Sequence, residues 1–551
     1  MTATFAAAQV GDNADADAQA RSFVQTYEAE VRPLEIEVGL RWWAANISGK
    51  DEDYQVKQEA ETCLELKLAD RQRFAALKAI RQAGPTDRRL ARQIELLYLQ
   101  AMGRQVDPEL IKRILAKSNA LERAFNVYRA RVDGEDLTDN QVRQVLTQSK
   151  DSRKRQTVWE ASKGVGPVVV GMLRELVELR NQVARSLGYA DYHVMQLALG
   201  EQSQAEVLAL FEQLDDLTRR PFQQVKATID AALAQQYGIA VEHLRPWHYH
   251  DPFFQEVPDV FGPPQEGVYT SIEILDACRK FYAGIGLPVD DVLDRSDLYE
   301  KPGKNPHAFC TDIDRAGDVR VLANIVPGHR WLSTMLHELG HAVYSSKNIP
   351  ESMPYVLRTE SHTLTTEGIA MLFERLADRS AWLVAMGALV PHPKAFDQAA
   401  DQRRRAQALI FSRWCQVMFR FERELYGRPD RDMNRLWWDL VEQYQGLRRP
   451  EGRDLPDYAS KIHLVIAPAY YHNYMLGELF ATQLQRTIAS QVLGGGDPRR
   501  ASYVGQPAVG QFLRERVFAP GRSLNWNELT RHATGEALNA AAFAEGVQQR
   551  Y

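Results

Sequence analysis

Helical periodicity runs through almost the entire chain. Between residues 17 and 47, apolar side chains such as Phe23, Tyr27, Val31 and Leu34 recur at every third or fourth position, which places them on one face of a helix. Breaks rich in glycine and proline separate this segment from others with the same pattern. These further segments are residues 60–83, 90–102, 108–130, 138–149, 153–187, 204–236 and 271–284. The sequence therefore predicts a mainly α-helical protein.

Strand-like sequence is confined to one short region. Residues 307–313 and 319–326 are bounded by Asn305-Pro306, by Gly317 and by Pro327-Gly328, which is typical of a β-hairpin. Residues 245–269 carry five prolines and are expected to form a long irregular crossing. Because the chain contains no internal repeat, we expect one large helical body with a small sheet.

Composition excludes several classes of protein. The 551 residues carry 67 Lys and Arg against 72 Asp and Glu, a net charge of −5, which argues against a general nucleic-acid binder. No apolar run approaches the ~20 residues of a membrane span, so we expect no membrane partner. Residues 1–20 lack the apolar core of a secretory signal and are expected to form a flexible tail. Four cysteines lie far apart and form no CxxC pair, which favours a cytoplasmic location: Cys63, Cys278, Cys310 and Cys415.

The strongest chemical signal is the motif His337-Glu338-Leu339-Gly340-His341. Residues four apart lie on the same face of a helix, so His337 and His341 can present two imidazoles to one metal ion. Glu338 lies beside them, where its carboxylate can act as a general base. The alternative is a surface helix with two solvated histidines. Apolar flanking residues argue against it, because they would bury the helix.

A catalytic zinc ion needs a third protein ligand and one open position. Residues 357–370 offer three candidates: Glu360, His362 and Glu367. Glu367 begins an apolar-periodic run, so we expect it in the first turn of a second helix that faces the histidines. His362 is the alternative ligand, whereas Glu360 is better suited to orienting a ligand histidine.

Together these residues resemble the gluzincin peptidases, which bind zinc through HExxH and a downstream Glu. More closely, the chain is similar to the angiotensin-converting-enzyme family of peptidyl dipeptidases, with features of the thimet oligopeptidase family. The segment His307-Ala308-Phe309 begins 30 positions before His337, as in that family, and the third-ligand helix aligns on Glu367. Downstream, Lys461-Ile462-His463 matches a Lys-x-His motif. The run of residues 468–474 matches a proline followed by two functional tyrosines.

The resemblance implies a two-lobed helical metallopeptidase with a deep central cleft and a small β-sheet beside the zinc helix. It implies that residues 21–551 form a single catalytic domain that binds one Zn²⁺ per chain, through His337, His341 and Glu367. Short peptides are the expected substrates, because two lobes around a cleft would exclude folded proteins. Endo- or exo-cleavage and the oligomeric state are left open.

The same resemblance assigns roles to the remaining motif residues. Glu338 is the expected general base, and Tyr474 and His463 are the expected donors to the oxyanion of the transition state. Lys461 and Tyr471 would contact the C-terminal side of the substrate.

Two residues of the predicted hairpin complete the expected substrate contacts. Ala308 would pair with the peptide backbone as part of an edge strand, and the preceding His307 would also contact the peptide.

Three positions depart from the family pattern. Met371 occupies the position of an Asp that supports a zinc histidine, so this support is expected from Glu360, Glu374 or the backbone. Asn473 replaces a chloride-linked Arg, and we therefore expect activity that does not depend on chloride. Trp247-His248-Tyr249 is the best match to a Trp-x-Gln motif whose Gln holds the substrate carboxylate. With Tyr249 at that position, a weakened carboxylate clamp is expected.

Two other functions are compatible with these residues. One is a zinc hydrolase that acts on a small amide-containing metabolite, which the altered clamp and histidine support would favour. The other is a zinc-containing binding protein without activity. The presence of Glu338, Tyr474 and His463 argues against that second alternative, since binding alone needs no general base.

Overall fold

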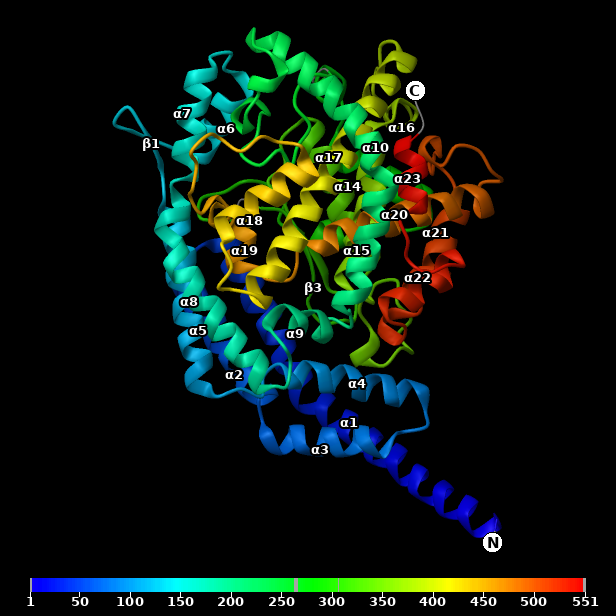
Figure 1. The fold of residues 1–551 in the computed structure, drawn as a ribbon. Helices are drawn as coiled ribbons and strands as arrows, with labels where there is room; N and C mark the ends of the chain where they lie inside the picture. Colours follow the sequence, from blue (N-terminus) through cyan, green and yellow to red (C-terminus); the bar gives the residue numbers. More distant parts are fainter. Residues whose placement is uncertain (1, 262–265, 306, 549–551) are drawn as a thin grey trace. The chain divides into compact units, whose positions relative to one another are not determined.

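The computed structural model describes residues 2–261, 266–305 and 307–548. Helices dominate these residues, and the strands within them form two antiparallel sheets of two strands each (Figure 1). The prediction of a mainly α-helical protein is therefore confirmed. In the same residues, no helix combines the length and the apolar character that crossing a membrane requires.

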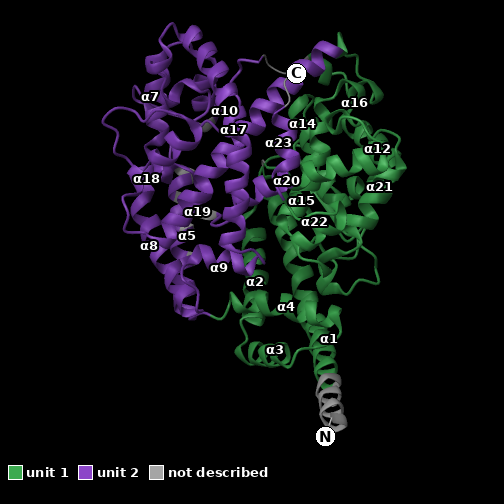
Figure 2. Cartoon of the chain, turned by 45° about the vertical axis from the view of Figure 1, so that its right-hand side comes forward, with its two compact units in different colours: residues 1–105, 265–393, 480–538 green, residues 106–264, 394–479, 539–551 purple. Residues whose placement is uncertain are grey.

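The chain divides into two compact units, each assembled from three separate segments (Figure 2). Unit 1 comprises residues 1–105, 265–393 and 480–538, and unit 2 comprises residues 106–264, 394–479 and 539–551. Residues that are hundreds of positions apart in sequence therefore share one core. That the two units act as a single catalytic domain remains a prediction.

Unit 1 contains the predicted metal-binding motif. Its helices and strands are α1 (Thr2–Ser48), α2 (Asp51–Leu68), α3 (Arg71–Ala83), α4 (Arg88–Met102), α11 (Glu266–Tyr269), α12 (Ile274–Gly284), α13 (Asp290–Arg295), β3 (Phe309–Asp312), β4 (Val319–Leu322), α14 (His329–Val343), α15 (Thr363–Glu374), α16 (Ser380–Ala385), α21 (Pro507–Leu513) and α22 (Trp526–Thr534).

Helix α1 begins at Thr2, inside the segment predicted as a flexible tail. Ala20 of this segment is buried, and Val24 and Val31 continue the same apolar face. This face packs with Leu77 of α3 and Ile94 of α4 in one hydrophobic core. The periodic spacing recognised in the sequence is thus the buried face of α1, while the flexibility of residues 1–20 stays a prediction.

The predicted hairpin is confirmed in a shorter form. Strand β3 pairs antiparallel with β4, in a register that runs from Phe309 opposite Leu322 to Asp312 opposite Val319. In the connecting turn, Gly317 has φ +104°, a conformation that residues with a side chain rarely adopt. Both strands pack against α14, so the small sheet lies beside the helix of the histidine motif, as predicted.

Unit 2 contains the downstream motifs. Its helices and strands are α5 (Pro108–Val127), β1 (Ala130–Val132), β2 (Glu135–Leu137), α6 (Asp139–Gln148), α7 (Ser152–Lys163), α8 (Val165–Ser186), α9 (Tyr192–Leu199), α10 (Gln204–Tyr237), α18 (Met433–Leu440), α19 (Ile462–Ile466) and α23 (Ala541–Gln548). Two helices contribute residues to both units: α17 (Pro393–Gly427) and α20 (His472–Thr487).

The hairpin of β1 and β2 was not predicted. The helix expected over residues 108–130 ends at Val127, and the strands turn at Asp133 and Gly134, with φ values of +52° and +87°. A two-residue Asp-Gly loop with positive φ at both positions is a strong hairpin signal. The sequence carries this signal directly after a segment with helical periodicity.

Candidate metal centre and substrate-binding cluster

Helix α14 presents His337 and His341 one turn apart, as the i, i+4 spacing requires. Their Nε2 atoms lie 3.1 Å apart. The hydroxyl of Tyr282 donates a hydrogen bond of 2.7 Å to the carbonyl oxygen of Leu336, next to the first histidine. Tyr282 of α12 therefore anchors the backbone of α14 where the motif begins.

Glu367 of α15 completes a group of three candidate metal ligands in unit 1. Its Oε2 lies 3.6 Å from Nε2 of His337 and 3.9 Å from Nε2 of His341, and the three ligand atoms all lie within 4.8 Å of one another. Tetrahedral zinc with ligand bonds of about 2.0–2.1 Å would separate its ligand atoms by roughly 3.4 Å. Two imidazole nitrogens and a carboxylate oxygen at this spacing fit a zinc ion.

A close approach of two helices brings Glu367 to the histidines. A Cβ atom added at Gly340 of α14 would lie 2.8 Å from the Cα of Ala370 in α15, closer than real Cβ contacts allow. Glycine at position 340 therefore permits α15 to lie directly against α14. Without this approach, a carboxylate on α15 would be held further from the imidazoles.

Both ring Nδ1 atoms have hydrogen-bond partners on α15. Nδ1 of His337 bonds to the carboxylate of Glu374, and Nδ1 of His341 lies 2.7 Å from the hydroxyl of Thr366. Such partners fix the ring orientation and leave Nε2 to face the metal. Glu360, one of the predicted supports, instead accepts a bond of 2.5 Å from the Thr359 hydroxyl.

His362, the alternative third ligand, has another role. It is the N-cap of α15, where its Nδ1 accepts a hydrogen bond of 3.1 Å from the backbone N–H of Leu364. Glu367 was expected in the first turn of this helix, but it lies just after that turn. His362 is not among the three residues whose ligand atoms converge.

Glu338 is buried beside the ligands, with 7% of its surface exposed. Burial raises the pKa of its carboxyl group to about 7; His337 opposes this shift, and Glu367 adds to it. The backbone of Cys310 in β3 forms a hydrogen bond that favours the ionised form. A carboxyl group with a pKa near neutrality can both accept and return a proton.

The two histidines differ in their protonation. Burial lowers the pKa of His337, but the carboxylates of Glu374, Glu338 and Glu367 outweigh it and raise the pKa to about 9. For His341, burial and the neighbouring His337 hold the pKa well below its ordinary value. A metal ligand must be deprotonated at the coordinating nitrogen, so metal binding would displace the proton from Nε2 of His337.

The second group of predicted residues lies in unit 2, around Gln255. The amide oxygen of Gln255 accepts hydrogen bonds from Nζ of Lys461 at 2.7 Å and from the hydroxyl of Tyr471 at 3.5 Å. The indole of Trp414 donates a bond of 2.8 Å to the Tyr471 hydroxyl. Burial lowers the pKa of Lys461 to about 8, although Asp251 acts in the opposite direction. We refer to Gln255, Lys461 and Tyr471 as the polar cluster.

Tyr249, the residue expected at the glutamine position, does not bond to Lys461 or Tyr471. The hydroxyl of Tyr249 donates to Asp230 at 2.8 Å and accepts from Lys226 at 2.9 Å, away from the polar cluster. Gln255 makes the contacts with Lys461 and Tyr471 instead. Phe253-Phe254-Gln255 is an aromatic-x-Gln pattern with Phe253 in place of tryptophan, so the sequence contains a signal for this residue.

Several side chains hold the backbone on both sides of Gln255. The amide of Gln407 donates to the carbonyl of Gln255 at 3.1 Å and accepts from the N–H of Val257 at 2.8 Å. The carboxylate of Asp251 accepts from the N–H of Gln255 at 2.9 Å. Residues 251–257 of the predicted irregular crossing are therefore held in place by several hydrogen bonds. Residues 262–265 of that crossing lie outside the described residues.

His463 and Tyr474 lie near Tyr471, in α19 and α20 of unit 2. The ring of Tyr471 is 5.0 Å from that of His463 and 5.4 Å from that of Tyr474, measured between centroids. Burial, assisted by Lys461, lowers the pKa of His463 to about 4. The imidazole is therefore neutral at pH 7 and keeps one N–H donor.

His307 and Ala308 directly precede β3 in unit 1. His307 is exposed, Ala308 is half-buried, and the strand itself begins at Phe309. Among the described strands, β3 pairs with β4 on one side only, so it is an edge strand.

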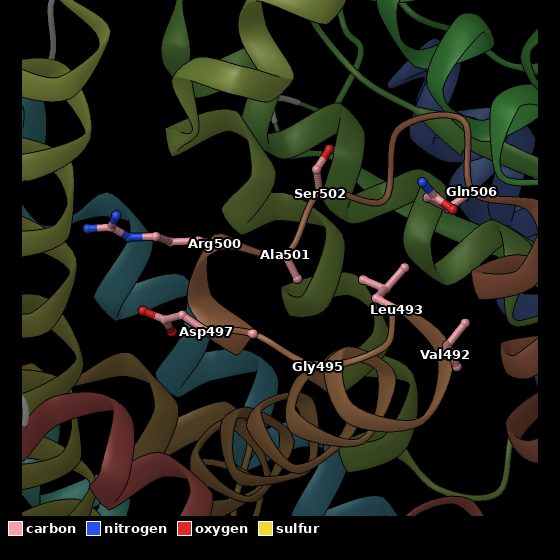
Figure 3. Close-up of a pocket in the computed structure, with 9 residues that line it drawn as sticks. Val492, Leu493, Gly495, Asp497, Arg500, Ala501, Ser502 and Gln506 are labelled. Atoms are coloured by element: carbon pink, nitrogen blue, oxygen red, sulfur yellow. The ribbon is translucent and has the colours of Figure 1, made fainter.

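An open cavity lies elsewhere in unit 1, away from both groups of predicted residues. It has a volume of 410 Å³ and is formed by the loop that follows residue 492. Arg500 and Asp497 lie on one side of it, and Val492 and Leu493 lie on the other (Figure 3). None of the predicted site residues lines it.

Comparison with known proteins matches two successive parts of the chain to two peptidase families. Residues 14–246 match the family model described as angiotensin-converting enzyme, and residues 294–549 match the model of peptidase family M3. The angiotensin-converting enzyme of Mesocricetus auratus is 21% identical over 585 residues, which cover 96% of this chain and 42% of that protein. The chain therefore spans less than half the length of this relative. It resembles the angiotensin-converting-enzyme family and has features of the M3 peptidases, as predicted.

Proposed function

We propose that this relative of two peptidase families hydrolyses peptide bonds in short peptides, with one zinc ion held by His337, His341 and Glu367. The observation that carries the proposal is the convergence of three ligand atoms within 4.8 Å, with the buried carboxyl of Glu338 beside them. A site for metal binding alone would need no such group.

In the proposed reaction, the metal and the side chains of the protein have separate roles. When bound, zinc would lower the pKa of a water molecule toward ~7 and polarise the scissile carbonyl. Glu338 would take a proton from the attacking water and pass it to the leaving amine. The same carboxyl group must therefore first accept and then donate this proton.

Tyr474 and His463 are proposed to donate hydrogen bonds to the oxyanion that develops on the carbonyl oxygen. A phenol and a neutral imidazole are directional donors that introduce no full charge. The low pKa of His463 supports this assignment, since the ring remains neutral throughout the physiological range. His307 and Ala308 are proposed to contact the peptide backbone beside the edge strand β3.

The polar cluster is proposed to hold the free C-terminal carboxylate of the substrate. Lys461 is 7% exposed, and no carboxylate of the described chain forms an ion pair with it. Its ammonium instead bonds to the neutral oxygen of Gln255. A substrate carboxylate could accept hydrogen bonds from Lys461, Tyr471 and the Gln255 amide together. This favours release of short C-terminal fragments over internal cleavage.

The two grounds for a metabolite hydrolase are thereby weakened. One was the apparent loss of the glutamine, and Gln255 supplies it. The other was the altered support of the zinc histidines, and Glu374 with Thr366 provides that support.

A digestion experiment tests the proposal. The purified chain is assayed for bound metal and incubated with a peptide library and with small non-peptide amides, with and without a chelator, and the products are identified by mass spectrometry. We expect about one zinc per chain, chelator-sensitive cleavage and products released from the C-terminal end. Zinc without cleavage would indicate a binding protein, and cleavage confined to non-peptide amides would indicate the metabolite hydrolase.

A further inference from the structure

A strained backbone residue lies between His463 and the two tyrosines of unit 2. Ala469 has φ +56°, in the left-handed region that residues with a Cβ atom rarely occupy. The residue is 8% exposed and follows Pro468. Such a conformation persists only where the surroundings hold it, so the contacts of Ala469 decide how the chain enters α20.

The contact that holds Ala469 comes from Glu422 of α17. The backbone N–H of Ala469 donates a hydrogen bond of 2.7 Å to Oε1 of Glu422. Glu422 is only 3% exposed. Burying a carboxyl group has a cost unless it is hydrogen-bonded, and the N–H of Ala469 supplies such a partner.

Neighbouring contacts hold the chain on either side of this point. Before it, the guanidinium of Arg180 donates to the carbonyl of Val465 at 3.2 Å. After it, Gln202 bonds to the imidazole of His472 at 2.7 Å and to the amide oxygen of Asn473 at 2.9 Å. Among these anchors, Glu422 is the one that acts on the strained residue itself.

Two proposed functional side chains depend on this turn. Tyr471 lies two residues after Ala469, and Tyr474 lies in the first turn of α20, with their rings 5.4 Å apart. A change of φ at Ala469 would rotate the chain that carries both. Tyr471 would then lose its bond with Trp414 and its place beside Gln255 and Lys461.

We propose that Glu422 is a positioning residue that holds Ala469 in its left-handed conformation and thereby orients Tyr471 and Tyr474 for hydrolysis and carboxylate binding. The inference rests on the proposed function of these tyrosines. It concerns a residue that touches no substrate and acts through one backbone hydrogen bond.

The test compares two replacements of Glu422. In Glu422→Gln the side-chain oxygen can still accept the bond, so kcat should stay within about threefold of the wild-type value. Glu422→Met removes the acceptor at similar volume, and kcat should fall at least tenfold. The preference for a free-acid peptide over its amide should fall as well, because Tyr471 is displaced, while the zinc content stays unchanged.

Glu424→Met is the matched control on the same helix. Glu424 is also buried, but it pairs with Arg423, Arg428 and Arg431 and does not contact the turn. This variant is expected to lower thermal stability without changing kcat or the acid preference. It therefore separates lost positioning from a general loss of stability in α17.

Rescue by glycine gives the decisive readout. Glycine adopts positive φ at little cost, so Glu422→Met combined with Ala469→Gly should recover most of the lost kcat. If Glu422→Met does not fold, Glu422→Leu, which also lacks an acceptor, is used with the same glycine. Wild-type kcat in a folded Glu422→Met variant, or no rescue by glycine, would overturn the proposal. Absence of peptidase activity in the wild type would instead refute the proposed function.

Discussion

The ammonium of Lys461 lies 2.7 Å from the amide oxygen of Gln255, 206 positions away in the sequence. Around this pair are the hydroxyl of Tyr471 and the aromatic rings of Phe253 and Trp414, over which Lys461 lies at 5.2 and 5.3 Å. A buried cation whose bonded partner is a neutral amide is suited to receive an anion.

Replacing Gln255 by Leu should weaken the binding of peptides with a free C-terminal carboxylate. Loss of a hydrogen bond to a charged group costs about 1.5–3 kcal/mol, so KM for the acid should rise about ten- to a hundredfold. KM for the matched C-terminal amide should change little. Tyr249→Phe serves as the control, because Tyr249 lies outside the polar cluster. Equal effects of Gln255→Leu on acid and amide would contradict the assignment.

The polar cluster should also produce a pH dependence at alkaline pH. Burial lowers the pKa of Lys461 to about 8, so the free enzyme loses this positive charge as the pH rises through 8. The charge is fully present below that value, and kcat/KM for acid peptides should therefore fall above it. Amide peptides should show no such step, and Lys461→Met should abolish it. A step of equal size for both substrates would assign the titration to another group.

Glu338→Gln should separate metal binding from turnover. The substitution keeps the three ligands but removes the proton acceptor, and general-base catalysis typically contributes 10²–10⁴-fold. We expect unchanged zinc content and a fall in kcat of at least a hundredfold, measured by metal analysis and peptide digestion. Activity near the wild-type level would exclude Glu338 as the base.

Glu367 and His362 should respond differently to replacement by alanine. Glu367→Ala removes one of three ligand atoms and should strongly lower the zinc content. His362→Ala removes the N-cap of α15, which costs about 1 kcal/mol of stability for ordinary caps, and should lower Tm with zinc retained. Metal analysis and thermal melts of both variants distinguish the two roles. The reverse pattern would make His362 the ligand.

Glu374 and Thr366 should tune the affinity for zinc. Each holds the Nδ1 atom of one ligand histidine, and loss of such a partner typically lowers metal affinity 10–100-fold. We expect Glu374→Ala and Thr366→Val to fall in this range when zinc is titrated against a competing chelator. Glu360→Gln is the control and should leave the affinity unchanged. A fall with Glu360→Gln alone would restore Glu360 as the support.

Local patterns in the sequence determined many of the helices, the β3–β4 hairpin and the histidine pair. Helical spacing predicted the buried face of α1, and turn residues predicted the β3–β4 hairpin, because both depend on neighbours within a few positions. The pairing of His337 with His341 follows from the helical repeat alone. The same reasoning explains why Asp133-Gly134 could have predicted the β1–β2 hairpin.

Tertiary structure decided which distant residues meet. Glu374 reaches His337 because Gly340 lets Ala370 of α15 lie directly against α14, and neither helix by itself reveals this packing. Gln255 meets Lys461 because hydrogen bonds with Gln407 and Asp251 hold the irregular segment of residues 251–257 in place. These contacts depend on how helices and loops pack across long sequence separations. Short-range periodicity contains no information about that packing.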